Sequence, residues 1–158
     1  MAKKTYVLHK DGEYIKWRTS NENGGERPCG TLIKWKRQGV KNVAVPDGVK
    51  VIGKSCFQAS IGDVVLPSSV EEIQDFAFDI CNGRVHIPNS VAKIAKHAFG
   101  DLEERKRIFQ KAYEEGLMKR ADYDVVQSVV VTTENSTAHQ FAKVNSIRFE
   151  LIVDERRL

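Results

Sequence analysis

The chain contains three segments that align with one another: VAVPDGVKVIGKSCF (43–57), VVLPSSVEEIQDFAF (64–78) and VHIPNSVAKIAKHAF (85–99). Each segment begins 21 residues after the one before it. The positions that recur in this phase include a proline, two aliphatic residues and a phenylalanine: Pro46/Pro67/Pro88, Val49/Val70/Val91, Ile52/Ile73/Ile94 and Phe57/Phe78/Phe99. Recurrence at a fixed period indicates a repeat architecture, in which each repeat is one supersecondary unit.

Each unit has a physical interpretation. The leading V-x-[VLI] trio predicts a short strand with two residues facing inward and one facing outward. Proline follows because it has no N–H to donate to a further ladder bond. The segment V-x-x-I-x-x-x-[AC]-F then predicts a helical turn or a compact coil under the strand. One unit cannot bury its own apolar face, so we expect the units to stack as a narrow parallel sheet over an internal ladder of Phe57, Phe78 and Phe99.

Length and composition are those of a single soluble domain or one small repeat array. The chain has 158 residues, of which 41% are apolar and 29% charged. Its longest apolar run is far shorter than the ~20 residues that a membrane span needs. The first residues, MAKKTYVLHKDGEY, lack the apolar core of a signal peptide. We therefore expect a cytoplasmic location for the chain as written.

The pattern V-x-[IVL]-P-x-[SG]-V-x-x-I-x-x-x-[AC]-F resembles the BspA-type leucine-rich repeat, and the resemblance extends over residues 31–100. It implies a right-handed solenoid of the α/β class with short parallel strands. It also implies a protein-binding role without enzymatic activity, because members of this family serve in adhesion and other protein contacts. The family is often found at the cell surface or secreted, which conflicts with the cytoplasmic expectation.

The flanks of the repeats predict capping elements within one domain, 1–158. Residues 5–17 predict a β-hairpin around Asp11-Gly12, a favoured tight-turn pair, and together with the loop that follows they form an N-terminal unit, 1–30. An opening strand and the three repeats occupy 31–100. The last unit is the C-terminal cap, 129–158. Residues 128–153 resemble the family's closing unit, with a strand, a short helix and a final strand, and we expect its outer face to be polar.

Between the repeats and the closing unit lies an insertion, 101–128. Its first part, 101–121, predicts an amphipathic helix whose start is capped by Asp101. Phe109 and Tyr113 belong to the apolar stripe, which we expect to pack on the flank of the repeats. A second copy or a partner protein is the alternative occupant of this stripe.

No motif predicts catalysis, a cofactor or a metal site. The histidines, His9, His86, His97 and His139, form no metal-binding or triad spacing. Cys56 and Cys81 occupy positions of the repeat that predict packing in the core. Cys29 is the only cysteine in a predicted loop, and an enzyme that uses it as a nucleophile is the third hypothesis. We therefore expect that the protein is not an enzyme.

The candidate partner-binding residues lie in rows that a stack of repeats aligns. The outward strand positions are Ala44, Val65 and His86, and the positions before each strand are Asn42, Asp63 and Arg84. We take Asp63, Val65, Arg84 and His86 as candidates on the strand face. Phe109 and Tyr113 are the candidates on the predicted helix.

The alternative function is nucleic-acid binding by the N-terminal quarter of the chain. Residues 1–42 hold ten basic and four acidic residues, a net charge of +6. A local excess of this size attracts acidic partners. The candidate phosphate contacts are Lys34, Lys36, Arg37 and Lys41, although no nucleic-acid-binding motif accompanies them.

Overall fold

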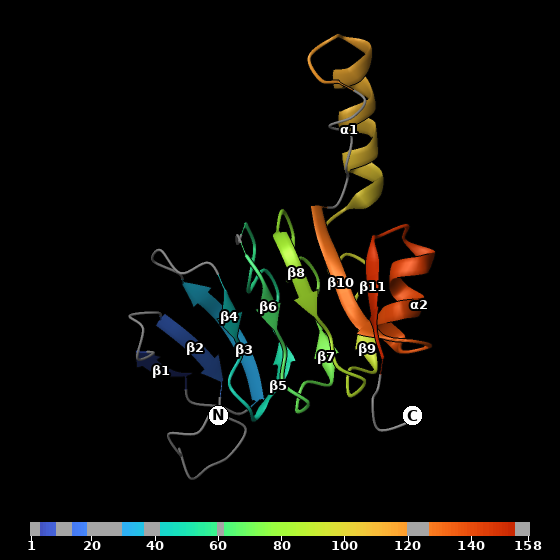
Figure 1. Ribbon diagram of the computed structural model, residues 1–158. Helices are drawn as coiled ribbons and strands as arrows, with labels where there is room; N and C mark the ends of the chain where they lie inside the picture. Colours follow the sequence, from blue (N-terminus) through green and yellow to red (C-terminus); the bar gives the residue numbers. More distant parts are fainter. Residues whose placement is uncertain are drawn as a thin grey trace.

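The computed structural model describes residues 4–8, 14–18, 30–36, 42–59, 62–119 and 127–153. Its strands form two sheets, which run across the molecule from the N-terminal strands to the C-terminal ones (Figure 1). The buried residues of the repeats belong to a single apolar core. The stack is therefore an α/β structure with mostly parallel strands and a core that continues from one repeat to the next.

One sheet has five strands, all parallel, in the spatial order β11-β10-β8-β6-β4. The V-x-[VLI] trios lie in it as predicted, with the first and third residue of each trio buried and Ala44 and Val65 exposed. The strands are β4 (Val43–Ala44), β6 (Val64–Val65), β8 (Asn82–His86), β10 (Gln127–Thr133) and β11 (Phe149–Ile152).

The second sheet corrects the prediction of one narrow sheet. The segment after each proline was expected to be a helical turn or coil, but it begins with a second short strand. Val49 and Ile52 are completely buried, and Glu71 N–H donates to Lys50 O at 2.7 Å, so the extended backbone pairs with the next repeat. A turn over residues 54–59 follows. Only this part of the segment has the compact conformation that was predicted for all of it.

This sheet has six strands in the order β1-β2-β3-β5-β7-β9. The first three pair antiparallel, and the others continue in parallel. The strands are β1 (Lys4–Leu8), β2 (Tyr14–Arg18), β3 (Gly30–Lys36), β5 (Val49–Ile52), β7 (Glu72–Ile73) and β9 (Lys93–Ile94). The predicted turn residues Asp11-Gly12 lie outside the described residues.

The aromatic ladder is confirmed. The ring centroids of Phe57 and Phe78 lie 5.5 Å apart, and so do those of Phe78 and Phe99. Each of these rings is at most 1% exposed. Phe141 of α2 (Thr137–Val144) continues the ladder with its ring 6.1 Å from that of Phe99. The same spacing that stacks the strands therefore stacks the rings in the core.

Helix α1 (Leu102–Glu114) is shorter than the predicted helix over 101–121. Asp101 caps its start by accepting from Glu104 N–H. It ends before Gly116, which has a φ of +74°, and Leu117 N–H then donates to Ala112 O. This is the hydrogen-bond pattern of a glycine-terminated helix.

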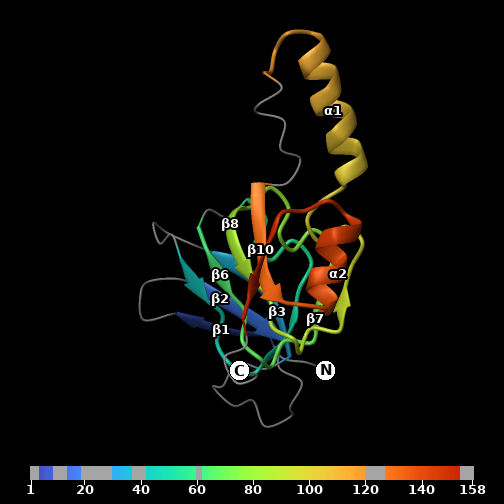
Figure 2. The ribbon, with the colours of Figure 1, turned by 45° about the vertical axis from the view of Figure 1, so that its right-hand side comes forward.

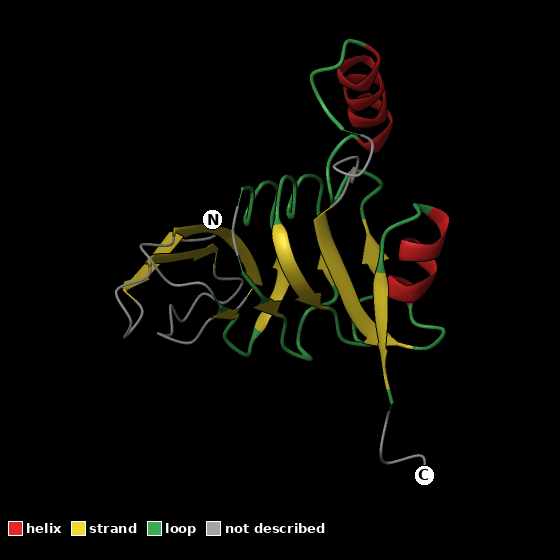
Figure 3. Ribbon diagram, turned by 45° about the horizontal axis from the view of Figure 1, so that its top comes forward, coloured by secondary structure: helices red, strands yellow, loops and turns green. Residues whose placement is uncertain are grey.

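The expected packing of α1 on the flank of the repeats is wrong. Among the residues of α1 only Leu102 is buried, and the helix projects away from both sheets (Figures 2 and 3). In the part of the chain that the structure describes, no helix has the length and apolar character of a membrane span.

The closing unit has the predicted order of strand, helix and strand. Ser136 caps α2 by accepting from His139 N–H, and Ala138 and Ala142 of α2 are buried. The expected polar outer face is not what the structure shows at β11. Four apolar residues at this end are exposed: Phe149, Leu151, Ile152 and Val153.

Candidate functional site

The outward row of the five-stranded sheet is longer than the sequence indicated. The strand registers place Ala44 beside Val65 and Val65 beside His86. They then continue the row through Val131 of β10 to Glu150 of β11. The repeat pattern does not include β10 and β11, so the last two positions were not predicted.

The row before the strands carries hydrogen bonds that hold the stack together. Asn42 Oδ1 accepts from Asp63 N–H at 3.1 Å, and Asp63 Oδ1 accepts from Arg84 N–H at 2.9 Å. Each side chain thus satisfies a backbone N–H one repeat further along. Asp63, a candidate partner contact, therefore also stabilises the stack by accepting a hydrogen bond from the next repeat.

Arg84 is held by a residue that the sequence did not point to. Its guanidinium reaches over β10 to Glu150, with Nη2 3.1 Å from Oε1 and Nε 3.2 Å from Oε2. The hydrogen bond and the charge of Glu150 raise the pKa of Arg84 above its ordinary range. Val131 lies in the same outward row and is only 5% exposed. Val65, in the same row, is 44% exposed and is therefore more accessible to a partner than Val131 is. His86 is half-buried.

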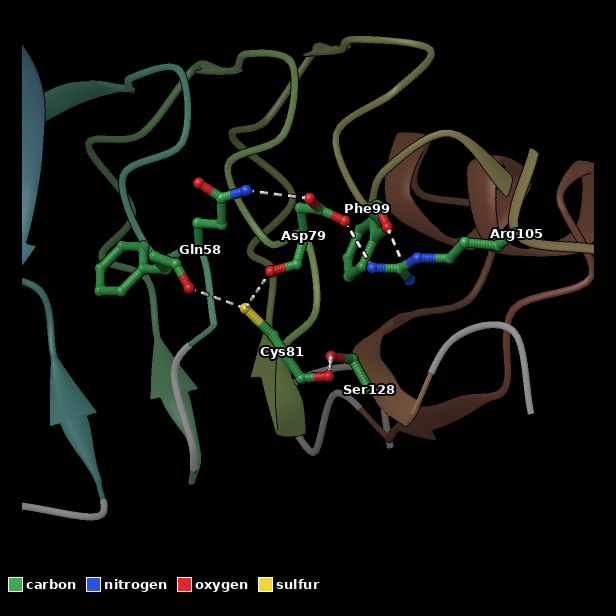
Figure 4. A network of polar contacts seen from close by, with 7 residues as sticks. Gln58, Asp79, Cys81, Phe99, Arg105 and Ser128 are labelled. Carbon is green, nitrogen blue, oxygen red and sulfur yellow. Dashed lines mark hydrogen bonds and ion pairs between the residues drawn. The ribbon is translucent and has the colours of Figure 1, made fainter. Parts of the chain in front are cut away.

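The base of α1 is fixed by polar contacts around Asp79, shown in Figure 4. Arg105 of α1 places its Nη2 2.5 Å from Asp79 Oδ1, and its Nη1 donates to Phe99 O at 3.5 Å. Gln58 Nε2 donates to the other Asp79 oxygen, Oδ2, at 3.1 Å. The two charged side chains are only 19% and 14% exposed.

The third repeat makes room for this ion pair by having glycine where the first two have Gln58 and Asp79. A Cβ added at Gly100 would lie 2.4 Å from Asp79 Oδ1 and 3.3 Å from Arg105 Cζ. Gly100 also has a φ of +103°, which side-chain-bearing residues rarely adopt. The direction in which α1 leaves the repeats thus depends on Gly100 and Arg105, at the start of the helix, and on Asp79, which lies 26 positions before Arg105.

Replacing Arg105 with alanine is expected to lower the free energy of unfolding by about 1.5–3 kcal/mol, because it removes a charge-assisted hydrogen bond from a largely buried carboxylate. Urea unfolding followed by circular dichroism measures this loss. The matched control is Arg107→Ala, whose ion pair with Glu104 on the same helix is 75% and 53% exposed. We expect the control to change stability by less than about 0.5 kcal/mol, and equal losses in both variants would contradict the anchoring role.

The same view shows the hydrogen bonds of Cys81, a cysteine in the core. Its Sγ donates to Phe57 O at 2.9 Å, and its backbone carbonyl accepts from Ser128 Oγ at 2.9 Å (Figure 4). Cys56 is also buried, as predicted. Cys29 lies outside the described residues. The two described thiols therefore lie in the packed interior of the repeats.

The apolar stripe of α1 is partly exposed. Ile108 is 54% and Tyr113 39% exposed, and Leu117, just beyond the helix, is 78% exposed. Phe109 is half-buried. The stripe therefore presents apolar side chains on an element that stands away from the repeats.

Two of the histidines that the structure describes, His97 and His139, pack against aromatic rings. His97 stacks on Phe76 with ring centroids 5.9 Å apart. His139 is buried, accepts Asn135 N–H at its Nδ1, and packs its ring edge-on against Phe149. Across the described ranges no group of three or more His, Cys, Asp or Glu residues is placed to hold a metal ion.

The nucleic-acid candidates are only partly described. Lys34 and Lys36 lie in β3, and the register of β2 with β3 places Lys34 opposite Lys16. Arg37 and Lys41 lie outside the described residues. The backbone thus places two lysines opposite each other, a pairing that the sequence spacing alone did not indicate.

Comparison with known proteins identifies one family. The model described as BspA type Leucine rich repeat region (6 copies) matches residues 35–115, which is 81 of the 158 residues. No curated protein and no solved structure matches the chain. The match covers the three repeats and continues through α1.

Proposed function

The chain belongs to the BspA-type leucine-rich repeat family, and from this premise we propose that it is a non-enzymatic protein–protein interaction module. Repeats of this kind are in general protein-binding scaffolds. In this proposal the repeats form a right-handed solenoid, the hairpin of β1 and β2 caps its N-terminal edge, and α1 is an inserted element that meets the partner. The same proposal treats 1–158 as one domain.

The observation that carries the proposal is the position of α1. An amphipathic helix normally turns its apolar stripe toward a core, but here Ile108 and Tyr113 are exposed while α1 projects from the stack. Exposed apolar side chains grouped on one element indicate a surface that another molecule covers. The ion pair of Asp79 with Arg105 supports this role, because it holds the base of the helix in one direction.

We expect the double substitution Phe109→Ala/Tyr113→Ala to weaken binding of a protein partner by about 30-fold or more, since truncating an aromatic hot spot costs about 2 kcal/mol or more. The measurement is capture by the immobilised full chain from a lysate of the source organism, followed by titration of the captured protein. The matched control is Gln110→Ala/Glu114→Ala, which removes a pair bonded at 2.9 Å on another side of the same helix. Retention of every partner by the Phe109/Tyr113 variant would reject α1 as the contact surface.

The strand face is tested in the same capture experiment. The double substitution Arg84→Ala/His86→Ala changes the outward row of β8 and leaves α1 intact. If this variant loses the partner while the α1 variant keeps it, the proposal moves to the row that contains Val65 and His86. Asp63 is left unchanged, because its carboxylate bonds to Arg84 N–H.

The alternative, nucleic-acid binding, is supported by the register that sets Lys16 opposite Lys34. Phosphate contacts make affinity fall steeply with salt. Capture that is lost on nuclease treatment or at high salt would therefore favour the N-terminal lysines. Capture that survives both treatments favours the protein-binding module.

A further inference from the structure

Strand β11 is the outer strand of the five-stranded sheet at the C-terminal end. It pairs in parallel with β10 on one side, and among the described residues no strand pairs with its other side. The edge of a strand presents backbone N–H and C=O groups that are suited to bonding a further strand. The kind of partner that this edge fits is therefore an extended segment of chain.

The composition of β11 does not protect this edge. Natural edge strands are commonly guarded by charged residues or proline, whereas β11 has a single charged residue, Glu150, which is paired with Arg84. Its apolar side chains are exposed: Phe149 by 38%, Leu151 by 44% and Ile152 by 49%, with Val153 beyond the strand exposed by 68%. An unguarded apolar edge of this kind indicates a pairing site.

We propose that β11 pairs antiparallel with β11 of a second copy of this chain, around a two-fold axis at Leu151. In this register Leu151 lies opposite Leu151 of the second copy, and Phe149 lies opposite Val153. Glu150 lies opposite Ile152. All five residues from 149 to 153 then pair, and each apolar residue of one face meets another apolar residue.

Charge disfavours the neighbouring register in which the two-fold axis lies at Glu150. A two-fold axis at Glu150 would place two carboxylates directly opposite each other, which is destabilising in a sheet. With the axis at Leu151 the two carboxylates are separated, and each keeps its ion pair with Arg84 of its own copy. A two-fold contact is also the commonest way in which identical chains associate. The edge can thus pair with itself through backbone hydrogen bonds and apolar contacts, with no like charges directly opposite each other.

The first test is the mass of the full chain in solution, measured by size-exclusion chromatography with light scattering over a range of concentrations. We expect a mass of about twice the 17.8 kDa of one chain. Leu151→Lys is expected to return the mass to one chain, because it places two ammonium groups at the axis. The matched control is Val65→Lys, at a residue that has the same 44% exposure but lies on β6. The α1 variant Phe109→Ala/Tyr113→Ala is expected to stay dimeric, so this result is independent of the proposed function.

The second test does not depend on a disruptive substitution. Leu151→Cys in a Cys29→Ser background is expected to form a covalent dimer on mild oxidation, since opposed residues in antiparallel strands lie within disulfide distance. The Val65→Cys variant in the same background is expected to form at least tenfold less covalent dimer under the same oxidation. A wild-type mass of one chain at every concentration would overturn the proposal. So would a Leu151→Lys variant that stays dimeric, or equal cross-linking at the two positions.

Discussion

Replacement of Phe78 with alanine is expected to lower the free energy of unfolding by about 3–5 kcal/mol, the usual cost of removing a buried aromatic ring. Phe78 is 1% exposed and lies between Phe57 and Phe99, with centroid distances of 5.5 Å on both sides. Its loss leaves a cavity in the middle of the ladder and removes two ring contacts at once. Because the repeats contact only their neighbours, the middle ring links the first repeat to the third.

Equilibrium unfolding in urea, followed by circular dichroism, measures this effect. The control is Phe76→Ala, which has the same chemical change two residues away. Phe76 is only partly buried and stacks on His97 alone among the described residues. We expect Phe76→Ala to lower the free energy of unfolding by less than half as much as Phe78→Ala does. Similar losses at the two positions would show that the ladder is not the main source of stability in the stack.

Replacement of Gly83 with alanine is expected to be as damaging, although it adds only one methyl group. A Cβ at this position would lie 2.3 Å from Gly62 O and 2.5 Å from Gly62 C, which are backbone atoms of the preceding repeat. The φ of Gly83 is +134°, a conformation that alanine rarely adopts. We expect the strained backbone to lower the free energy of unfolding by about 1–3 kcal/mol. The clash in the packed stack is expected to lower it by about a further 1–3 kcal/mol.

The measurement is again the free energy of unfolding, and Gly116→Ala is the control. Gly116 also has a positive φ, +74°, but nothing lies within 4 Å of an added Cβ. We therefore expect Gly116→Ala to lower the free energy of unfolding only through the strained backbone at the end of α1, without a clash. A loss at Gly83 no larger than that at Gly116 would show that the two repeats can separate enough to accept a methyl group.

The repeats could be predicted because their determinants are local and periodic. Val43, Val64 and Val85 share the 21-residue phase with the buried phenylalanines, and each has the same surroundings in the stack. The closing unit was also predictable, since Ala138 and Ala142 follow the spacing of a helix packed on one side. The second sheet was missed because Val49 and Ile52 have a spacing that a helical turn and a short strand with a bend both satisfy.

The candidate surfaces were predicted less completely. Val65 and His86 were found because the phase aligns them. Glu150 was missed as the partner of Arg84, because the two residues are 66 positions apart and no repeat relates them. The link between Asp79 and Arg105 was missed for the same reason, and with it the direction of α1.

The amino-acid sequence alone determined the family, the period of the stack, the aromatic ladder and the presence of a capped amphipathic helix after the third repeat. These features follow from the identity and spacing of residues that are neighbours along the chain or one repeat apart. The tertiary structure decided that α1 projects, that Arg84 is held over β10 by Glu150, and that β11 ends the sheet with an apolar edge. These features depend on contacts between segments with no periodic relation, because only packing of the complete stack brings those segments together.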